Sequence, residues 1–415
     1  MKNRRFVLLG VLLVLLAACL LVIGCGGTTS TSGTTTAIGN TTASAATTST
    51  ATSATTKTVS VKVGLAAMLT GQLAKYGQDS ANALNLAVDE FNASQSKIRV
   101  SVEPLDDASD PGKASVLAQK AASDDTIVGI VGPMQSTTML AALPVYETVV
   151  LPVISASASM TNLSAQGYKV FHRVCPIDDA QGTAIATFLV EDLKVKRVFM
   201  TDDKGAYSVG LGDQIEKELK RMGVTDIQRT TVFTDDKDFA PLITKVMAFQ
   251  PDVFLGIMPS AAQYAAVAKQ MVQQFNYHVQ LMGTETVKDT TEFITNAGGS
   301  TEGAYCTSLG PLLDTMQDPK TEALVKAYKD KGWELSMFSG QSYEAANIML
   351  DAISRAYDAT NGKITRQAVL DALNKTDYTG VLGIRVQFTP QGDMTLSGVN
   401  IIQVKNGQFV QVKAM

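Results

Sequence analysis

The sequence predicts an α/β protein with two lobes, each built on a parallel sheet that helices cover on both faces. Three observations lead to this prediction. Short, nearly continuous apolar strands alternate with amphipathic helices from residue 58 onward, and the alternation starts a second time near residue 197. The chain has 415 residues, of which 45% are hydrophobic, so it can bury more than one core.

The first series begins with a strand over 59–69. A helix is predicted over 78–94, because four apolar residues recur at the spacing i, i+3, i+4 and i+7 and share one face: Leu84, Ala87, Val88 and Phe91. The same reasoning predicts, in order, a strand over 98–106, a helix over 111–123, a strand over 126–131, a helix over about 136–148 and a strand over 149–154.

The second series has a similar size. It predicts strands over 197–201, 229–233, 253–258 and 279–282, and helices over about 209–222, 239–249 and 261–275. A long helix with an apolar stripe follows over 341–359. The chain ends in β-like alternation, "IRVQFTP" and "VNIIQVKNGQFVQV", with a turn signal at Asn406-Gly407. This late segment is expected to pack on one or both lobes.

The N-terminus has the form of a secretory signal over residues 1–24. Basic residues precede an apolar stretch from Phe6 to Ile23, and small residues follow it. V-I-G-C at 22–25 also resembles the bacterial lipobox, which predicts lipid attachment at Cys25. The alternative is Cys19 in L-A-A-C, but cleavage there would leave L-L-V-I on the mature chain. The alternative to a cleaved signal is an uncleaved membrane anchor. In either case the protein is expected outside the cytoplasm and tethered to a membrane.

Residues 25–57 are predicted to be a flexible linker. The segment is rich in Thr, Ser, Gly and Ala and has almost nothing that could form a core. A linker of this composition and length spans about 30 Å on average, enough to hold a globular body just off a membrane. The net charge is −4, without a basic cluster beyond the first residues, which argues against nucleic acid as a partner.

Two predicted strands end in clusters of small hydroxyl residues. Ser136 follows the strand 126–131 in "GPMQSTTM", and Ser157 and Ser159 follow the next strand in "LPVISASASM". The carboxyl ends of parallel strands are where open α/β sheets bind ligands. A nucleophile, a phosphate cradle, a cradle for another ligand and simple helix capping are the alternatives.

The sequence weighs against the first two alternatives. Neither cluster has the G-x-S-x-G form of a nucleophilic elbow, and the only histidines, His172 and His278, are expected to be packing or surface residues. No G-x-x-x-x-G-K-[ST] phosphate loop is present. Capping by Ser136 and Ser157 stays open. It is compatible with ligand binding, because free N–H groups at a helix start beside hydroxyls favour a carboxylate.

Six segments carry a resemblance to a known family. They are "VKVGLAAMLTGQLAKYGQDSANALNLAVDEFNA", "DDASDPGKA", "VGPMQSTTM", "LPVISASAS", "VFHRVCPIDDAQG" and "LMGTETV". Together, and in this order, they resemble the leucine/isoleucine/valine-binding proteins, which have the type I periplasmic binding fold and serve branched-chain amino-acid ABC transporters. The resemblance covers roughly residues 59–410.

The family fold implies two Rossmann-like lobes joined by three crossing hinge segments, with the ligand between them. Carried over, lobe 1 comprises 58–174 and 310–388, and lobe 2 comprises 175–309 and 389–415. The restart of the strand–helix series after "FHRVCP" agrees with this division.

The resemblance also implies a binding site for an α-amino acid. The hydroxyls and backbone amides of Ser136 and Ser159 are expected on the carboxylate, and the backbone carbonyl of Ser157 on the ammonium. Glu285 in "LMGTETV" matches a glutamate that accepts the ammonium. Tyr207 matches a tyrosine over the ligand, and Tyr76 one at the opposite rim.

Other readings of these residues stay open. Glu285 could be an ordinary surface glutamate, and either tyrosine could be core packing with a satisfied hydroxyl. The chain also departs from the family in "FLGIMPSAA", residues 254–262, where Ser260, or Ala261 in a shifted register, replaces a tyrosine. The side-chain end of the pocket is therefore less well supported than the amino-acid end.

The resemblance implies an extracytoplasmic, lipid-anchored binding protein of an ABC importer. It would close on its ligand as a monomer and be recognised by the permease subunits, with no catalytic residue, cofactor or metal. The alternatives are a binder of another small carboxylate or amide, such as an aromatic acid, and a ligand-sensing co-receptor of a signalling protein. A hydrolase is disfavoured by the lack of a base. Cys175 and Cys306 are expected to be free and buried, although an extracytoplasmic location permits a disulfide.

Overall fold

The computed structural model describes residues 58–395 and 398–415. The predicted signal peptide, the linker 25–57, Cys25 and Cys19 lie outside the described residues. Within the described ranges no helix is both long and apolar enough to cross a membrane.

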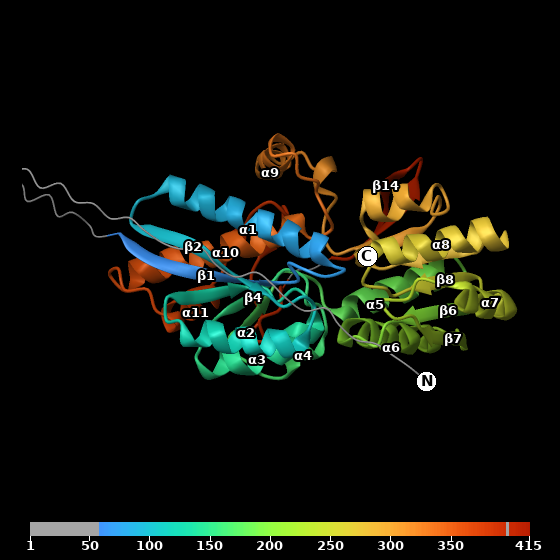
Figure 1. The fold of residues 1–415 in the computed structure, drawn as a ribbon, viewed down its shortest axis with the longest axis horizontal. Coiled ribbons are helices and arrows are strands. Elements are labelled where there is room, and N and C mark those ends of the chain that lie inside the picture. Colours follow the sequence, from blue (N-terminus) through green and yellow to red (C-terminus); the bar gives the residue numbers. More distant parts are fainter. Residues whose placement is uncertain (1–57, 396–397) are drawn as a thin grey trace, which may run out of the picture. The chain divides into compact units, whose positions relative to one another are not determined.

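Lobe 1 is built on a parallel sheet in the order β2-β1-β3-β4-β5 (Figure 1). Every residue of β3 is buried, as expected for a strand with both faces covered. The strands are β1 (Val59–Ala67), β2 (Ile98–Asp106), β3 (Ile127–Val131), β4 (Val153–Ser155) and β5 (Phe171–Arg173).

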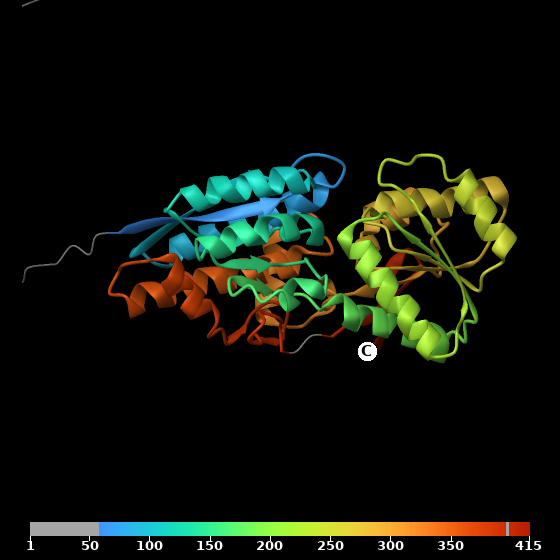
Figure 2. The ribbon, with the colours of Figure 1, turned by 90° about the horizontal axis from the view of Figure 1, so that it is seen from below.

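Helices cover both faces of this sheet (Figures 1 and 2). Helices α1 and α10 share one apolar core with the sheet, and α2 and α3 share a second core on the other face. The helices and short strands outside the second lobe are α1 (Ala74–Ser94), α2 (Pro111–Ser123), α3 (Ser136–Thr148), α4 (Asn162–Ala165), the 3-10 turn η4 (Leu313–Thr315), α9 (Pro319–Asp330), α10 (Ser339–Ala359), α11 (Arg366–Leu373), β11 (Tyr378–Thr379) and β12 (Arg385–Val386).

Lobe 2 is built on a sheet in the order β14-β13-β10-β9-β8-β6-β7. The strands from β7 to β10 are parallel, and the C-terminal hairpin adds β13 and β14 in antiparallel register. Asn406 and Gly407, at the predicted turn, both have positive φ, 52° and 73°. The strands are β6 (Arg197–Asp202), β7 (Asp226–Thr231), β8 (Val253–Gly256), β9 (Gln280–Gly283), β10 (Tyr305–Ser308), β13 (Asn400–Lys405) and β14 (Gln408–Ala414).

The helices of lobe 2 also form two layers. Helices α5 and α6 pack into one core, and α7 and α8 into the other (Figure 2). They are α5 (Asp178–Thr187), α6 (Ala206–Arg221), α7 (Ala240–Phe249) and α8 (Ala261–Phe275), with the short turns η1 (Phe188–Asp192), η2 (Glu285–Val287) and η3 (Thr290–Thr295). The prediction of two α/β lobes with parallel sheets is confirmed.

Helix α1 begins four residues and β7 three residues earlier than predicted, and two strand predictions were wrong over most of their length. The strand predicted over 149–154 is shorter, because α3 runs to Thr148 and the chain then turns at Val150, whose φ is 55°, before β4 begins. The segment "IRVQFTP" forms only the two-residue strand β12. Its neighbour Phe388 pairs with Met394 in a single bridge instead of continuing the strand.

The last crossing between lobes lies later than the sequence division at 388/389. Gly392 accepts a hydrogen bond from the backbone N–H of Arg173 at 3.0 Å, and Asp393 pairs with the Arg173 side chain at 2.7 Å. Residues 389–393 therefore pack on lobe 1, and the chain reaches the lobe 2 sheet at β13.

Candidate functional site

A cleft lies where the carboxyl ends of strands from both sheets meet. In each lobe the order of the parallel strands reverses beside the first strand, between β1 and β3 in lobe 1 and between β6 and β8 in lobe 2. Such reversal points open a crevice beyond the strand ends. Residues that follow all four of these strands line one cleft of about 610 Å³, part of which is open to solvent.

The structure brings five of the six predicted site residues together. The predicted residues that line this cleft are Ser136, Ser157, Tyr207, Glu285 and Tyr76. Ser159 is fully buried behind the lining, and its Oγ has no hydrogen-bond partner among the residues that the structure describes. The strand-end clusters thus supply neighbouring groups, as their place in the sequence predicts.

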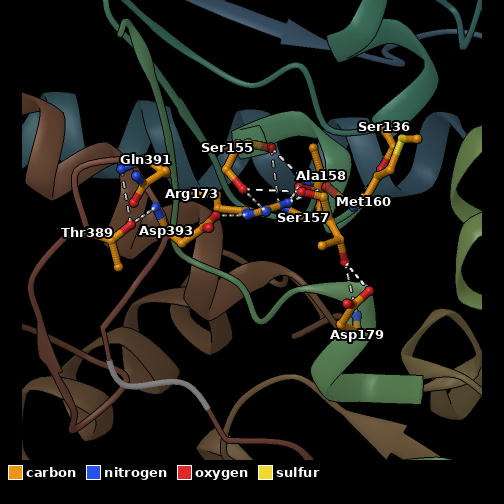
Figure 3. Close-up of polar contacts among 12 residues, drawn as sticks. Ser136, Ser155, Ser157, Ala158, Met160, Arg173, Asp179, Thr389, Gln391 and Asp393 are labelled. Carbon is orange, nitrogen blue, oxygen red and sulfur yellow. Dashed lines mark hydrogen bonds and ion pairs between the residues drawn. The ribbon is translucent and has the colours of Figure 1, made fainter. Parts of the chain in front are cut away.

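Neither Ser136 nor Ser157 caps a helix, so the capping alternative is wrong. The N-cap of α3 is Gln135, without a side-chain cap bond, and Ser136 is the first helical residue. Ser136 Oγ instead accepts the N–H of Met160 at 3.2 Å (Figure 3). Ser157 Oγ donates to the carbonyl of Met134 at 2.8 Å. The first N–H groups of α3 have no partner within the helix and lie at the cleft.

Glu285 is a buried carboxylate, not a surface glutamate. Its side chain follows β9 and is only 3% exposed. Oε2 accepts hydrogen bonds from the Tyr207 hydroxyl at 2.8 Å and from Nε2 of Gln181. Gln181 in turn donates to Thr307 Oγ1 at 2.7 Å, which fixes its amide. Burial raises the pKa of the Glu285 carboxyl, because charge is costly away from water.

Asp178 is a second buried carboxyl beside Glu285 that the sequence analysis missed. It is the first residue of α5 and is 2% exposed, and neither carboxylate oxygen has a hydrogen-bond partner in the described part of the chain. Burial raises its pKa to about 7; the nearby Ser159 hydroxyl lowers it, and the negative charge of Glu285 raises it further. The signal was available, since Asp178 and Gln181 stand three apart in the quoted "IDDAQG" and so share a helix face.

The two carboxyl groups lack a basic partner. Among residues 58–395 and 398–415, neither Glu285 nor Asp178 forms an ion pair with a lysine, arginine or histidine, although Arg173 and Lys288 are near enough to favour their charged forms. Two buried carboxyl groups without a cation make a site that attracts positive charge.

Tyr207 and Tyr76 both have hydrogen-bonded hydroxyls, and Tyr76 is also a buried member of the apolar core of lobe 1. Tyr207 donates to Glu285, and burial raises the pKa of its phenol well above the ordinary value. Tyr76, near the start of α1, is 3% exposed, and its hydroxyl accepts the N–H of Ala261 at 3.3 Å. Because Ala261 begins α8 of lobe 2, Tyr76 links the two rims of the cleft.

The rest of the cleft wall is apolar. Ser260 does not face the cleft but caps α8, where its Oγ accepts the N–H of Gln263 at 3.2 Å. Pro259 takes the wall position at this point of the chain. The apolar lining residues are Met68, Leu73, Met134, Pro259, Met337 and Phe338.

The histidines and cysteines play no part in this cleft. His172 is buried, its Nε2 lies 3.0 Å from Asn374 Oδ1, and burial lowers its pKa to about 4. His278 is exposed. Cys175 and Cys306 are both free and buried, which confirms the prediction for them.

A model of the periplasmic binding protein family matches residues 60–408. The chain belongs to this family. Members are binding proteins that act outside the cytoplasm, so the predicted family and fold are confirmed.

Individual members of the family resemble the chain over most of its length. It is 26% identical to the Leu/Ile/Val-binding protein BraC3 of Rhizobium johnstonii, over 84% of this chain and 93% of that protein. It is 28% identical to a leucine-, isoleucine-, valine-, threonine- and alanine-binding protein of Pseudomonas aeruginosa, over 81% and 87%. A leucine-binding protein of Thermotoga maritima superposes with a TM-score of 0.76 at 26% identity, covering 86% of this chain and 98% of that one.

Proposed function

We propose that the protein is the extracytoplasmic solute-binding component of an ABC importer and captures a small apolar amino acid, of branched-chain type, in the cleft. The proposal rests on the presence of two opposite kinds of group at one site. Lobe 1 provides free helix N–H groups and hydroxyls, and lobe 2 provides the buried carboxyl groups of Glu285 and Asp178. A zwitterion is complementary to both. The names of the similar proteins support the same class of ligand.

The ligand carboxylate binds at the start of α3. Ser136 Oγ accepts one hydrogen bond and still has its own proton to donate. The backbone N–H groups of Ser136 and Thr137 are also free to donate, because Gln135 provides no side-chain cap. Ser159 is fully buried and its hydroxyl lies near Asp178, so its predicted contact with the carboxylate does not form in this arrangement.

The ligand ammonium binds between the lobes. Both side-chain donors that reach Glu285 use Oε2, which leaves Oε1 for an ammonium proton. The backbone carbonyl of Ser157 is the second acceptor, and Asp178 adds negative charge behind Glu285. The ligand side chain then extends along the methionines and Phe338 of the apolar wall.

Closure of the lobes completes the site. Several hydrogen bonds and ion pairs join the lobes around the cleft, among them three between side chains or helix starts on opposite rims: Thr137 Oγ1 accepts the N–H of Ala206 at 3.2 Å, Tyr76 accepts that of Ala261, and Lys75 pairs with Asp289 at 2.6 Å. Each contact breaks when the lobes separate, so each stabilises the closed, ligand-bound form.

We expect Lys75→Met to speed ligand release. The pair joins α1 to a buried aspartate of lobe 2, with Lys75 34% and Asp289 4% exposed. Its loss raises the dissociation rate about five- to tenfold and leaves the association rate within about twofold, because the pair forms only on closure. Stopped-flow measurement of both rates tests this.

Lys62→Met is the matched control. Lys62 is 36% exposed and pairs with Asp124 at 2.9 Å, but this pair lies within lobe 1. Equal changes of the dissociation rate in the two variants would contradict a role of Lys75 in closure.

Binding is expected to weaken below about pH 7. In the ligand-free protein, burial raises the pKa of Asp178 to about 7, so this carboxyl is protonated at lower pH. A ligand ammonium favours the charged carboxylate and lowers that pKa, so binding releases a proton near neutral pH and affinity rises with pH through this range. Calorimetry in buffers of different ionisation enthalpy measures the released proton, and Asp178→Asn removes it. Affinity that stays constant from pH 5 to 8 would contradict the assignment.

The cellular setting is part of the proposal. The N-terminal signal and the lipobox predict a lipid anchor at Cys25, with Cys19 as the alternative, and the ABC permease subunits are the expected partners of the closed form.

A thermal-shift screen of amino acids, aromatic acids and amides tests the proposed ligand class. A ligand at about 100 times its Kd stabilises the protein by about 2.7 kcal/mol. If an aromatic acid shifts the melting temperature and no α-amino acid does, the ligand assignment is wrong.

A further inference from the structure

Arg173, the last residue of β5, is a fully buried arginine that donates hydrogen bonds to four acceptors. Its side chain is 0% exposed. Nε donates to Asp393 Oδ1 at 2.7 Å, Nη1 donates to the carbonyls of Ala158 at 3.0 Å and Met160 at 2.8 Å, and Nη2 donates to Ser164 Oγ at 3.0 Å. Figure 3 shows the guanidinium between the loop 155–160 and the segment 389–393. Four of the five N–H donors of Arg173 are therefore paired, and a buried arginine needs such extensive pairing to be tolerated.

The loop that Arg173 contacts carries the serines of the cleft. After β4 ends at Ser155 the chain has no regular structure until α4, so its buried carbonyls need partners from elsewhere. The two carbonyls that Arg173 binds flank Ser159. The N–H of Met160 in turn donates to Ser136 Oγ, so the same loop positions the serine at the start of α3.

Arg173 also lies where two chain crossings leave lobe 1. The next residues, 174–177, lead into α5 of lobe 2, whose first N–H, that of Asp178, donates to the carbonyl of Ser159 at 2.9 Å. Asp393 precedes the passage to β13, and the Arg173 N–H donates to the neighbouring Gly392 carbonyl at 3.0 Å. Arg173 thus contacts the loop 155–160, here called the serine loop, and the segment that leads into one crossing, and it directly precedes the other crossing in the chain.

We propose that Arg173 is a positioning residue that couples the serine loop to the hinge. It holds the loop in the geometry that receives the ligand, and it holds the two crossings together. A shift of the loop on ligand binding therefore displaces the segments that must bend on closure. The binding aspect of this inference rests on the proposed function, whereas the coupling of the loop to the crossings does not.

The test uses Arg173→Met, Arg173→Lys and Asp393→Asn, with Arg366→Met as the matched control. Arg366 also donates to several backbone carbonyls, those of Ile127, Ala121, Ala122 and Asp124, but at the amino end of β3 away from the cleft. Hydrogen exchange of the ligand-free protein and the Kd for leucine are measured well below each variant's melting temperature.

Arg173→Met should speed amide exchange at least about tenfold both in residues 156–161 and in residues 174–178, and weaken leucine binding at least about tenfold. Arg173→Lys, which keeps the charge toward Asp393, should recover part of the affinity, and Asp393→Asn should weaken it less than Arg173→Met does. Arg366→Met should lower the melting temperature and leave Kd within about twofold.

The outcomes separate the two proposals. If both segments keep their protection in Arg173→Met, the inference is overturned, whatever the protein binds. If Arg366→Met weakens binding as much as the Arg173 variants do, the effect is general destabilisation and the inference also fails. If Arg173→Met does not fold, unchanged exchange and affinity in Arg173→Lys and Asp393→Asn overturn it. A wild-type protein that binds no α-amino acid contradicts only the proposed function.

Discussion

Glu285→Gln is expected to weaken the binding of an α-amino acid about 30-fold to more than 1000-fold. Truncating one partner of a buried, hydrogen-bonded charge pair costs about 2–5 kcal/mol, and the ligand ammonium would lose its main acceptor. The variant should not lower the free energy of unfolding of the ligand-free protein, because burial already disfavours the charged carboxylate. Titration calorimetry measures the affinity, and urea denaturation the stability.

Glu344→Gln is the control for this experiment. Glu344 on α10 is also fully buried and accepts the N–H groups of Gly380 at 3.2 Å and Val381 at 2.9 Å, away from the cleft. Its replacement should change stability and leave the affinity within about twofold. Wild-type affinity in Glu285→Gln would remove this residue from the ligand site.

Gly132→Ala is expected to destabilise the protein by about 2–5 kcal/mol. Gly132 follows β3 with φ +101°, and a Cβ there would lie 2.0 Å from the carbonyl oxygen of Ala66 in β1. Positive φ costs a non-glycine residue about 1–2 kcal/mol, and overpacking adds about 1–3 kcal/mol. The backbone shift would also displace Ser136, so ligand affinity should fall with stability.

Gly167→Ala is the control that measures backbone strain from positive φ without a steric clash. Gly167 has φ +81° but no atom within 4 Å of an added Cβ, so only the strain of about 1–2 kcal/mol applies. Urea denaturation of both variants measures the difference. Equal destabilisation would mean that the contact of Gly132 with β1 has no energetic role.

The sequence predicted the regular elements well where local signals were strong. The helices over 136–148 and 261–275 begin and end at the predicted residues, because clear breaks flank each apolar run. The start of β4 was misjudged, since the apolar "VVLPV" reads as strand although Val150 turns the chain. Periodicity reports burial, and a buried turn has the same composition as a buried strand.

The site was predicted in part, because strand ends can be read from the sequence and hydrogen-bond satisfaction cannot. Glu285 was expected as the acceptor, yet its support by Gln181 and Tyr207 depends on how α5 and α6 pack in lobe 2. The sequence places Asp178 on one helix face with Gln181, but only the packed structure shows that its carboxylate oxygens lack partners. The wall of methionines was also missed, since methionine is an ordinary core residue and only the fold decides which ones border a cleft.

Titration calorimetry of leucine and two analogues tests the recognition of a zwitterion most directly. Isocaproate keeps the carboxylate and side chain but lacks the ammonium, and leucinamide keeps the ammonium but lacks the carboxylate. Recognition of both ends of a zwitterion predicts that leucine binds and that each analogue binds at least about 100-fold more weakly. If isocaproate binds as tightly as leucine, recognition of the ligand ammonium by the buried carboxyl groups is contradicted, because these groups would then have no role in choosing the ligand.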